Sequence, residues 1–250
     1  NPFKRLTLLG GSRYDYVDIK GYYLFSGVNK DVNKQISKFV PRLTAMYDLT
    51  ETLKLRGSFA QGYRAPQAFD EDLHTAVIDG DPIFVELDRD LKSETSNSYT
   101  ASLNYTQREG NTQANLILEG FFTQINNSFI DQDLTDIGNI KHKIKTNASD
   151  LLNIMGANIE ANFAFGSKWV WQTGFTYQQS RFSEAQTIWE SEDDTNPKKV
   201  TSDRVMRSPD FYGYTTLSYS PIAPLKLSYN GVLTGAMDVP HVIDVETKEP

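Results

Sequence analysis

Apolar and polar residues alternate with a period of two along most of the chain, whereas helical periodicity is weak. A period of two is the pattern of a β-strand that has one apolar and one polar face. In residues 99–106, for example, tyrosine, alanine and leucine alternate with threonine, serine and asparagine. The alternation predicts nine strands, near residues 5–17, 39–49, 52–62, 95–107, 113–126, 154–165, 169–181, 210–220 and 224–236.

The predicted strands and their connections have unusual lengths. Strands in soluble proteins average ~5–6 residues, whereas a tilted strand that crosses a bilayer needs ~9–11, which the predicted strands reach or exceed. Short connections at 50–51, 108–111, 166–168 and 221–224 alternate with long polar ones at 18–38, 63–94, 127–153 and 182–209. Short turns on one side and long loops on the other are typical of membrane barrels, whereas a soluble sandwich has no reason to separate them. We therefore expect an all-β, antiparallel, up-and-down transmembrane β-barrel.

Aromatic residues lie near both ends of the predicted strands, which is the pattern of two interfacial girdles. Those near short connections are Tyr47, Phe163, Phe165, Trp169, Trp171 and Tyr219, and those near long ones are Tyr14, Tyr16, Tyr63, Tyr177 and Phe182. The alternative is that tyrosine and phenylalanine are common in any strand.

Composition removes several classes of protein. The net charge is -7, which argues against a nucleic-acid binder, because such a protein needs a basic face. The chain has no cysteine, so structural disulfides, cysteine-ligated zinc and thiol nucleophiles are excluded. No window reaches the ~18 consecutive apolar residues that a membrane helix requires.

Several segments resemble the barrel of TonB-dependent outer-membrane receptors. The hairpin that begins at Pro41-Arg42 and ends in Gly62-Tyr63-Arg64-Ala65-Pro66 is similar to a motif of that family, and Leu91-Lys92-Ser93-Glu94-Thr95-Ser96 is similar to the strand entry that follows it, with Ser93 in place of the usual proline. Residues 156–161 are similar to a further strand of the family, and residues 207–214 and 233–241 resemble barrel segments of such receptors from Bacteroidetes-type bacteria. The resemblance covers about residues 38–241.

The resemblance implies a 22-stranded barrel preceded by a signal peptide, an energy-coupling box and a globular plug, none of which is recognised in residues 1–250. We therefore expect this chain to be part of the barrel domain, with strands missing on both sides, in the outer membrane of a Gram-negative bacterium. The implied partners are the lipid bilayer, TonB through the missing N-terminal region, and a small-molecule or chelate ligand. The implied function is import of a scarce large solute: an iron–siderophore, haem, cobalamin or glycan. A passive porin-like barrel, an enzymatic barrel and a soluble β-sandwich binding module are the alternatives.

No motif of a catalytic, phosphate-binding or cofactor-binding site is present, so we expect neither an enzyme nor a cofactor. His74, His142 and His241 are isolated on presumed loops, so we expect no metal site. Aromatic and arginine side chains supply contact area and directed donors for bulky ligands. The ligand contacts expected on the long loops are Tyr63, Arg64, Phe69, His74, Phe129, His142 and Trp189. For Arg64 the alternative is a tie between a loop and the rim of the barrel, and for Trp189 it is a packing anchor. The charged residues expected to face the barrel interior are Arg56, Glu119, Glu160 and Lys226.

Overall fold

The computed structural model describes residues 2–25, 28–67, 83–135, 141–190 and 198–239. Almost all of the regular structure in these ranges is β-strand, apart from a single 3-10 turn, η1 (Pro2–Arg5). Within the described ranges, no helix is long and apolar enough to cross a membrane.

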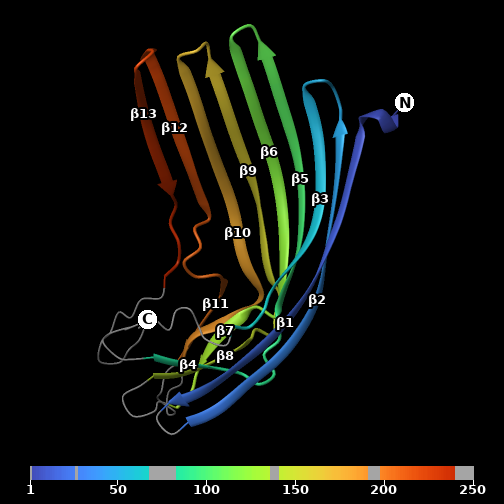
Figure 1. The fold of residues 1–250 in the computed structure, drawn as a ribbon. Coiled ribbons are helices and arrows are strands. Elements are labelled where there is room, and N and C mark those ends of the chain that lie inside the picture. The colour runs from blue at the N-terminus through green and yellow to red at the C-terminus, as the bar shows by residue number, and fades with distance from the viewer. Residues whose placement is uncertain (1, 26–27, 68–82, 136–140, 191–197, 240–250) are drawn as a thin grey trace.

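Nine strands form one continuous sheet, which we call the wall. In order across the sheet they are β1 (Leu6–Phe25), β2 (Val28–Asp48), β3 (Leu53–Arg64), β5 (Glu94–Glu109), β6 (Thr112–Asn126), β9 (Leu152–Phe165), β10 (Trp169–Glu190), β12 (Phe211–Ile222) and β13 (Leu225–Thr234). Each strand pairs antiparallel with the wall strand that precedes it in the chain, so the topology is up-and-down (Figure 1). The nine predicted strands are confirmed.

The prediction of loops in the four long connections is wrong, because each contains further strand. β1 and β2 stay paired through most of 18–38, up to Phe25 opposite Val28. β10 runs on to Glu190 and pairs with β11 (Lys199–Arg204). The other two connections contain β4 (Ile83–Leu87), β7 (Phe129–Asp133) and β8 (Lys141–Asn147). These segments escaped detection because a strand outside the membrane keeps its ladder of hydrogen bonds without needing an apolar face.

The strand register places the predicted faces on opposite sides of the wall. One row across neighbouring strands consists of Leu55, Leu103, Leu118, Ile159 and Phe175, and we call this side the apolar face. The adjacent row on the other side, the polar face, consists of Arg56, Ser102, Glu119, Asn158 and Thr176. Glu160 and Lys226 also fall on the polar face by their register. The four charged residues expected to face the interior therefore do share one side.

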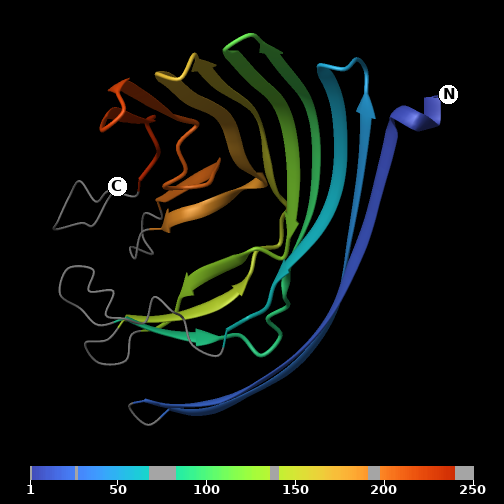
Figure 2. The same cartoon turned by 45° about the horizontal axis from the view of Figure 1, so that its top comes forward.

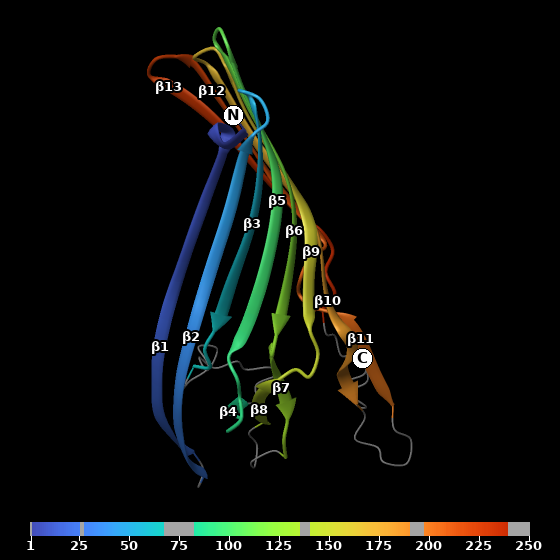
Figure 3. The same ribbon diagram turned by 90° about the vertical axis from the view of Figure 1, so that its right-hand side faces the viewer.

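The apolar face of the wall is bare. Leu118 is 51% exposed and Ile159 is 44% exposed, although both lie in the middle of the sheet. Figures 2 and 3 show the wall as a single curved layer. In the described part of the chain, no second sheet covers this face, so the interpretation as a soluble β-sandwich is wrong. A sheet with one uncovered apolar face is what a lipid-facing barrel wall requires.

Aromatic rings gather in two zones of the apolar face. Near the short turns, Trp169 and Tyr219 stack with 4.0 Å between ring centroids, and Phe163 and Trp171 with 5.5 Å. Near the long connections, Tyr99 lies 5.1 Å from Phe59 and 6.4 Å from Phe122. Phe182 pairs with Leu152 on the polar face, so its predicted place in a girdle is wrong.

The two aromatic zones have the spacing of membrane interfaces. Met155 lies in the same row as Phe122, and Phe165 lies ten residues further along β9. Ten residues span about 33 Å along a strand, and a tilt of about 40° reduces this to about 25 Å of height. This matches the ~25 Å apolar band of outer-membrane barrels.

A lysine in place of Ile159 should destabilise the barrel by about 2–4 kcal/mol, because it would place a charge near the middle of the lipid band. The test is equilibrium unfolding of the full-length protein folded into lipid vesicles. Asn158→Lys, on the polar face of the same strand, is the matched control and should cost far less. Equal costs for the two variants would contradict the assignment of the faces.

Candidate ligand-binding site

A second, three-stranded sheet lies at the long-connection end of the wall, near the β1–β2 and β10–β11 hairpins (Figures 1 and 2). β8 is its central strand, with β4 parallel on one side and β7 antiparallel on the other. Since its strands come from two different long connections, this loop sheet joins parts of the chain that sequence alone left as separate loops.

The loop sheet meets the wall at a closely packed junction, which we call the rim clasp. Pro66 is fully buried there, and Leu91, Ser93, Ser128 and Ala148 are also buried. In the described ranges the other buried residues are Glu86 of the loop sheet and Thr44 and Gly174 of the wall. Most buried residues of the described ranges therefore lie where the loop sheet joins the rim, because the wall itself is a single layer.

Glu94 is the central charged group of the rim clasp. Its side chain accepts a hydrogen bond from Arg64 Nε at 2.6 Å and another from the backbone N–H of Phe129 at 2.6 Å. Arg64 and Glu94 are cross-strand partners on the polar face. The Arg64 guanidinium also lies over the Phe129 ring, with Cζ 4.7 Å from the ring centroid. One carboxylate thus connects the ends of β3, β5 and β7.

Asn147 makes the second connection of the clasp. Its amide oxygen accepts from the Lys92 N–H at 2.7 Å, and its amide nitrogen donates to the carbonyls of Lys92 and Asn127 at 3.0 and 2.8 Å. Asn127 has a φ of 54°, a conformation that asparagine tolerates better than most residues. This tight turn brings the end of β6 within reach of Asn147.

Lys34 links the extended β1–β2 hairpin to the segment after β4. Its ammonium donates to the carbonyls of Asp88, Arg89 and Leu91 at 3.0, 2.9 and 2.8 Å, so all three of its protons have acceptors. Burial lowers the pKa of Lys34, while the charges of Asp88 and Asp90 oppose that shift. β2 pairs with β3 from Arg42 to Asp48, whereas the part of β2 before Arg42 pairs with β1 alone. The hairpin is then a two-stranded ribbon, which has little stability of its own, so this link helps to set its position.

His142 is on strand β8, so its predicted place on a loop is wrong. Its Nε2 lies 3.5 Å from Glu86 Oε2, and its side chain is 12% exposed. The pair is enclosed in the loop sheet, which indicates a structural role better than direct contact with a ligand. Within the described residues, no group of three or more acidic, histidine or cysteine side chains could hold a metal ion.

Among the expected ligand contacts that the structure describes, Arg64 and Phe129 are brought into direct contact. Tyr63 is half-buried next to Arg64 at the end of β3. Trp189 lies on β10 opposite Val200 in β11. Phe69 and His74 lie outside the described residues. Sequence reasoning missed Glu94, Asn147 and Lys34 because each acts through contacts with residues distant in the chain, although Glu94 lies inside a segment that the resemblance had marked.

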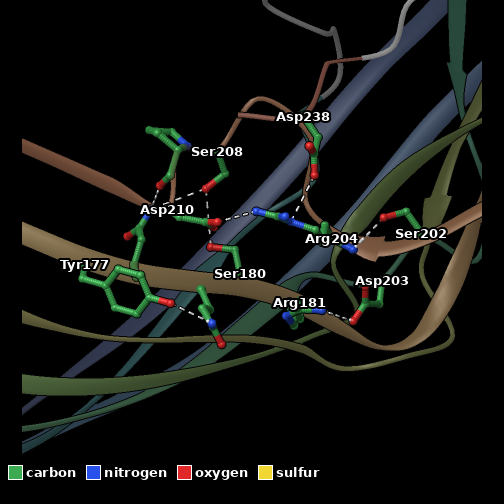
Figure 4. A network of polar contacts seen from close by, with 12 residues as sticks. Tyr177, Ser180, Arg181, Ser202, Asp203, Arg204, Ser208, Asp210 and Asp238 are labelled. Atoms are coloured by element: carbon green, nitrogen blue, oxygen red, sulfur yellow. Dashed lines mark hydrogen bonds and ion pairs between the residues drawn. The ribbon is translucent and has the colours of Figure 1, made fainter. Parts of the chain in front are cut away.

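A second polar network fixes the loops beyond β10 and β11 (Figure 4). Arg204 forms ion pairs with Asp210 and with Asp238, the latter at 3.0 Å. Arg181 of β10 pairs with Asp203 of β11 at 2.6 Å. The hydrogen bond from Arg181 lowers the pKa of Asp203. The network ties the β10–β11 hairpin to the segments on both sides of the β12–β13 hairpin.

A hollow of about 460 Å³ is lined by Leu8, Gly10, Leu43, Gly57 and Phe59, among others. Leu8, Leu43 and Phe59 lie on the apolar face by their register, whereas Leu9, Thr44 and Ser58, which also line the hollow, lie on the polar face. Because its lining is shared between the two faces of one sheet, we do not regard the hollow as the ligand site.

Lys34→Met should loosen the β1–β2 hairpin, because it removes three hydrogen bonds to one turn. Backbone amides in residues 18–25 and 28–37 of the full-length protein should exchange hydrogen faster, while those of β5 and β6 should not change. Lys38→Met, on the same face of β2, is the control. A hairpin protected equally in both variants would show that Lys34 does not position it.

The Arg181–Asp203 pair should stabilise the β10–β11 hairpin in a pH-dependent way. Because the folded-state pKa of Asp203 lies below its ordinary value of 3.8, the contribution is complete above that value and is lost as the pH falls through the lowered pKa. Arg181→Gln should therefore increase hairpin exchange at neutral pH and have little effect in strong acid. The measurement is hydrogen exchange at both pH values, and an effect that persists unchanged in acid would contradict the assignment.

Comparison with known proteins supports the fold. The family model for the TonB-dependent receptor-like β-barrel matches residues 1–238. No curated protein matches the sequence.

Solved structures of outer-membrane receptors have the same fold at low sequence identity. The siderophore receptor PiuA from Acinetobacter baumannii is 13% identical, with a TM-score of 0.66 over 92% of this chain and 31% of that one. The hemophore receptor HasR from Serratia marcescens, solved with its hemophore HasA and heme, is 15% identical, with a TM-score of 0.64 over 93% and 42%. The ferric yersiniabactin receptor FyuA from Yersinia pestis is 18% identical, with a TM-score of 0.58 over 94% and 33%.

The chain spans less than half the length of each of these receptors. The wall, its bare apolar face and the match over residues 1–238 agree on a partial transmembrane barrel. Proteins of the matched family are transporters rather than enzymes, and they reside in the outer membrane of Gram-negative bacteria. This chain belongs to the TonB-dependent receptor β-barrel family.

Proposed function

We propose that the chain forms part of the barrel wall and of the outer mouth of a receptor that imports a scarce, large solute with energy delivered through TonB. The observation that carries the proposal is the combination of a one-sided wall with a prefolded loop sheet at one end. A passive pore needs only the wall, whereas a receptor also needs a structured surface that recognises its ligand.

The proposal assigns the plug and the TonB-contacting segment to parts of the receptor outside these 250 residues. It assigns the first contact with the solute to the polar face at the rim and to the loop sheet. The similar receptors PiuA, FyuA and HasR take a siderophore, ferric yersiniabactin and heme, and the similar protein OprC is a copper transporter. This likeness supports a metal-containing small molecule as the first candidate for the solute of this receptor.

The test is uptake by the full-length receptor in a bacterial host, with and without functional TonB. The probes are a ferric tris-hydroxamate, a ferric tris-catecholate, ferric citrate, haem, cobalamin and an oligosaccharide. We expect at least one probe to accumulate only when both the receptor and TonB are present. Uptake that is equal without TonB would instead indicate a porin-like barrel.

A further inference from the structure

We propose that Arg64 and Phe129 form a recognition site for a planar anionic group of the ligand, such as a carboxylate or a catecholate. The proposal rests on the proposed receptor function and adds the chemical class of the ligand. Arg64 and Phe129 lie 65 positions apart in the sequence, and the fold brings them into direct contact.

The Arg64 guanidinium is held in one orientation. Its Nε donates to Glu94, whose side chain is 15% exposed, and one of its planar faces lies on the Phe129 ring. The backbone N–H of Phe129 donates to the other oxygen of the same carboxylate, which fixes the ring relative to the arginine. A guanidinium fixed by an ion pair and by a ring loses little freedom when a ligand binds.

The same guanidinium keeps most of its donors available to a ligand. A guanidinium has five N–H donors, and the ion pair with Glu94 uses the one on Nε. The Arg64 side chain is 63% exposed, although it is paired. Its outer edge can therefore donate two parallel hydrogen bonds to a carboxylate or to the two oxygens of a catecholate.

The position of Arg64 suits a ligand that enters from outside. It is the last residue of β3 and lies on the polar face, which points toward the interior of the closed barrel. Residues 86–90, in the connection that leads to Glu94, include three acidic side chains. An anionic group would be repelled by that background, so its binding would depend on a fixed cationic group at the rim.

Arg13 is a matched control within the same chain. It is also an exposed arginine whose Nε pairs with a carboxylate, Asp15, at 2.8 Å, and its side chain is 68% exposed. Its partner is two residues away on the same strand, whereas the partner of Arg64 lies on a different strand. A general effect of rim charge should appear in variants of both arginines, whereas a built site should appear only at Arg64.

The experiment measures binding to the purified full-length receptor with three probes: ferric citrate and a ferric tris-catecholate, which are anionic, and a neutral ferric tris-hydroxamate. Arg64→Lys keeps the positive charge but removes the paired N–H donors of the guanidinium. It should weaken binding of at least one anionic probe by about tenfold to a hundredfold. Binding of the neutral probe should not change, and Arg13→Lys should affect none. Phe129→Leu, which keeps the arginine, should weaken binding of the same anionic probe to a smaller degree. This variant tests the site independently if Arg64→Lys fails to fold.

Three outcomes would overturn the inference. They are equal losses for neutral and anionic probes, equal effects of the Arg64 and Arg13 variants, and a wild-type receptor that binds neither anionic probe. Uptake is measured separately. Selective anion binding without TonB-dependent uptake would refute the proposed transport function while leaving the recognition site intact.

Discussion

The inter-strand hydrogen-bond ladder is the interaction on which the rest of this structure depends. Hydrocarbon offers no partner to a backbone N–H or C=O, so a chain that crosses a membrane without helices must pair every strand. The wall meets this requirement with antiparallel neighbours in simple chain order, which needs only short turns on one side. The ladder also sets the faces, because one row joins Leu55, Leu103 and Leu118, and the adjacent row on the other side joins Arg56, Ser102 and Glu119. A slip of one residue in any strand would expose its polar side to lipid.

This constraint explains why the fold of the wall could be predicted from sequence and the rim could not. Inside the membrane, Leu103, Leu118 and Ile159 must alternate with polar residues, and the alternation reveals the strand. Outside it, residues 18–25 and 28–38 still pair along the whole hairpin, but no apolar face is needed and the pattern fades. The nine wall strands were therefore evident from sequence, while the hairpin extensions and the three strands of the loop sheet were not.

The candidate site follows the same division. Arg64 and Phe129 could be selected one by one as exposed residues of suitable chemistry, but their contact depends on Glu94, whose importance is visible only after β3, β5 and β7 converge. His142 illustrates the opposite case. A lone histidine in a polar segment suggested a ligand contact, whereas the fold encloses it beside Glu86. Residue type shows what a side chain can do, while tertiary contacts decide whether it is available to do it.

Buried residues are concentrated where the loop sheet joins the wall, at the rim of the barrel. A single-layer wall has no core, because lipid covers one of its faces and the barrel interior lies against the other. Buried residues such as Pro66, Leu91 and Ala148 instead collect where the loop sheet joins the rim. At this junction Asn147 accepts a hydrogen bond from the backbone N–H of Lys92, and Glu94 accepts one from that of Phe129, so both backbone donors have partners. Tertiary contacts between segments distant in the chain are therefore concentrated at the proposed outer mouth, in the rim clasp. The shape of this mouth comes from the clasp rather than from the barrel, so loop residues outside the clasp can vary without changing the wall or the contact between Arg64 and Phe129.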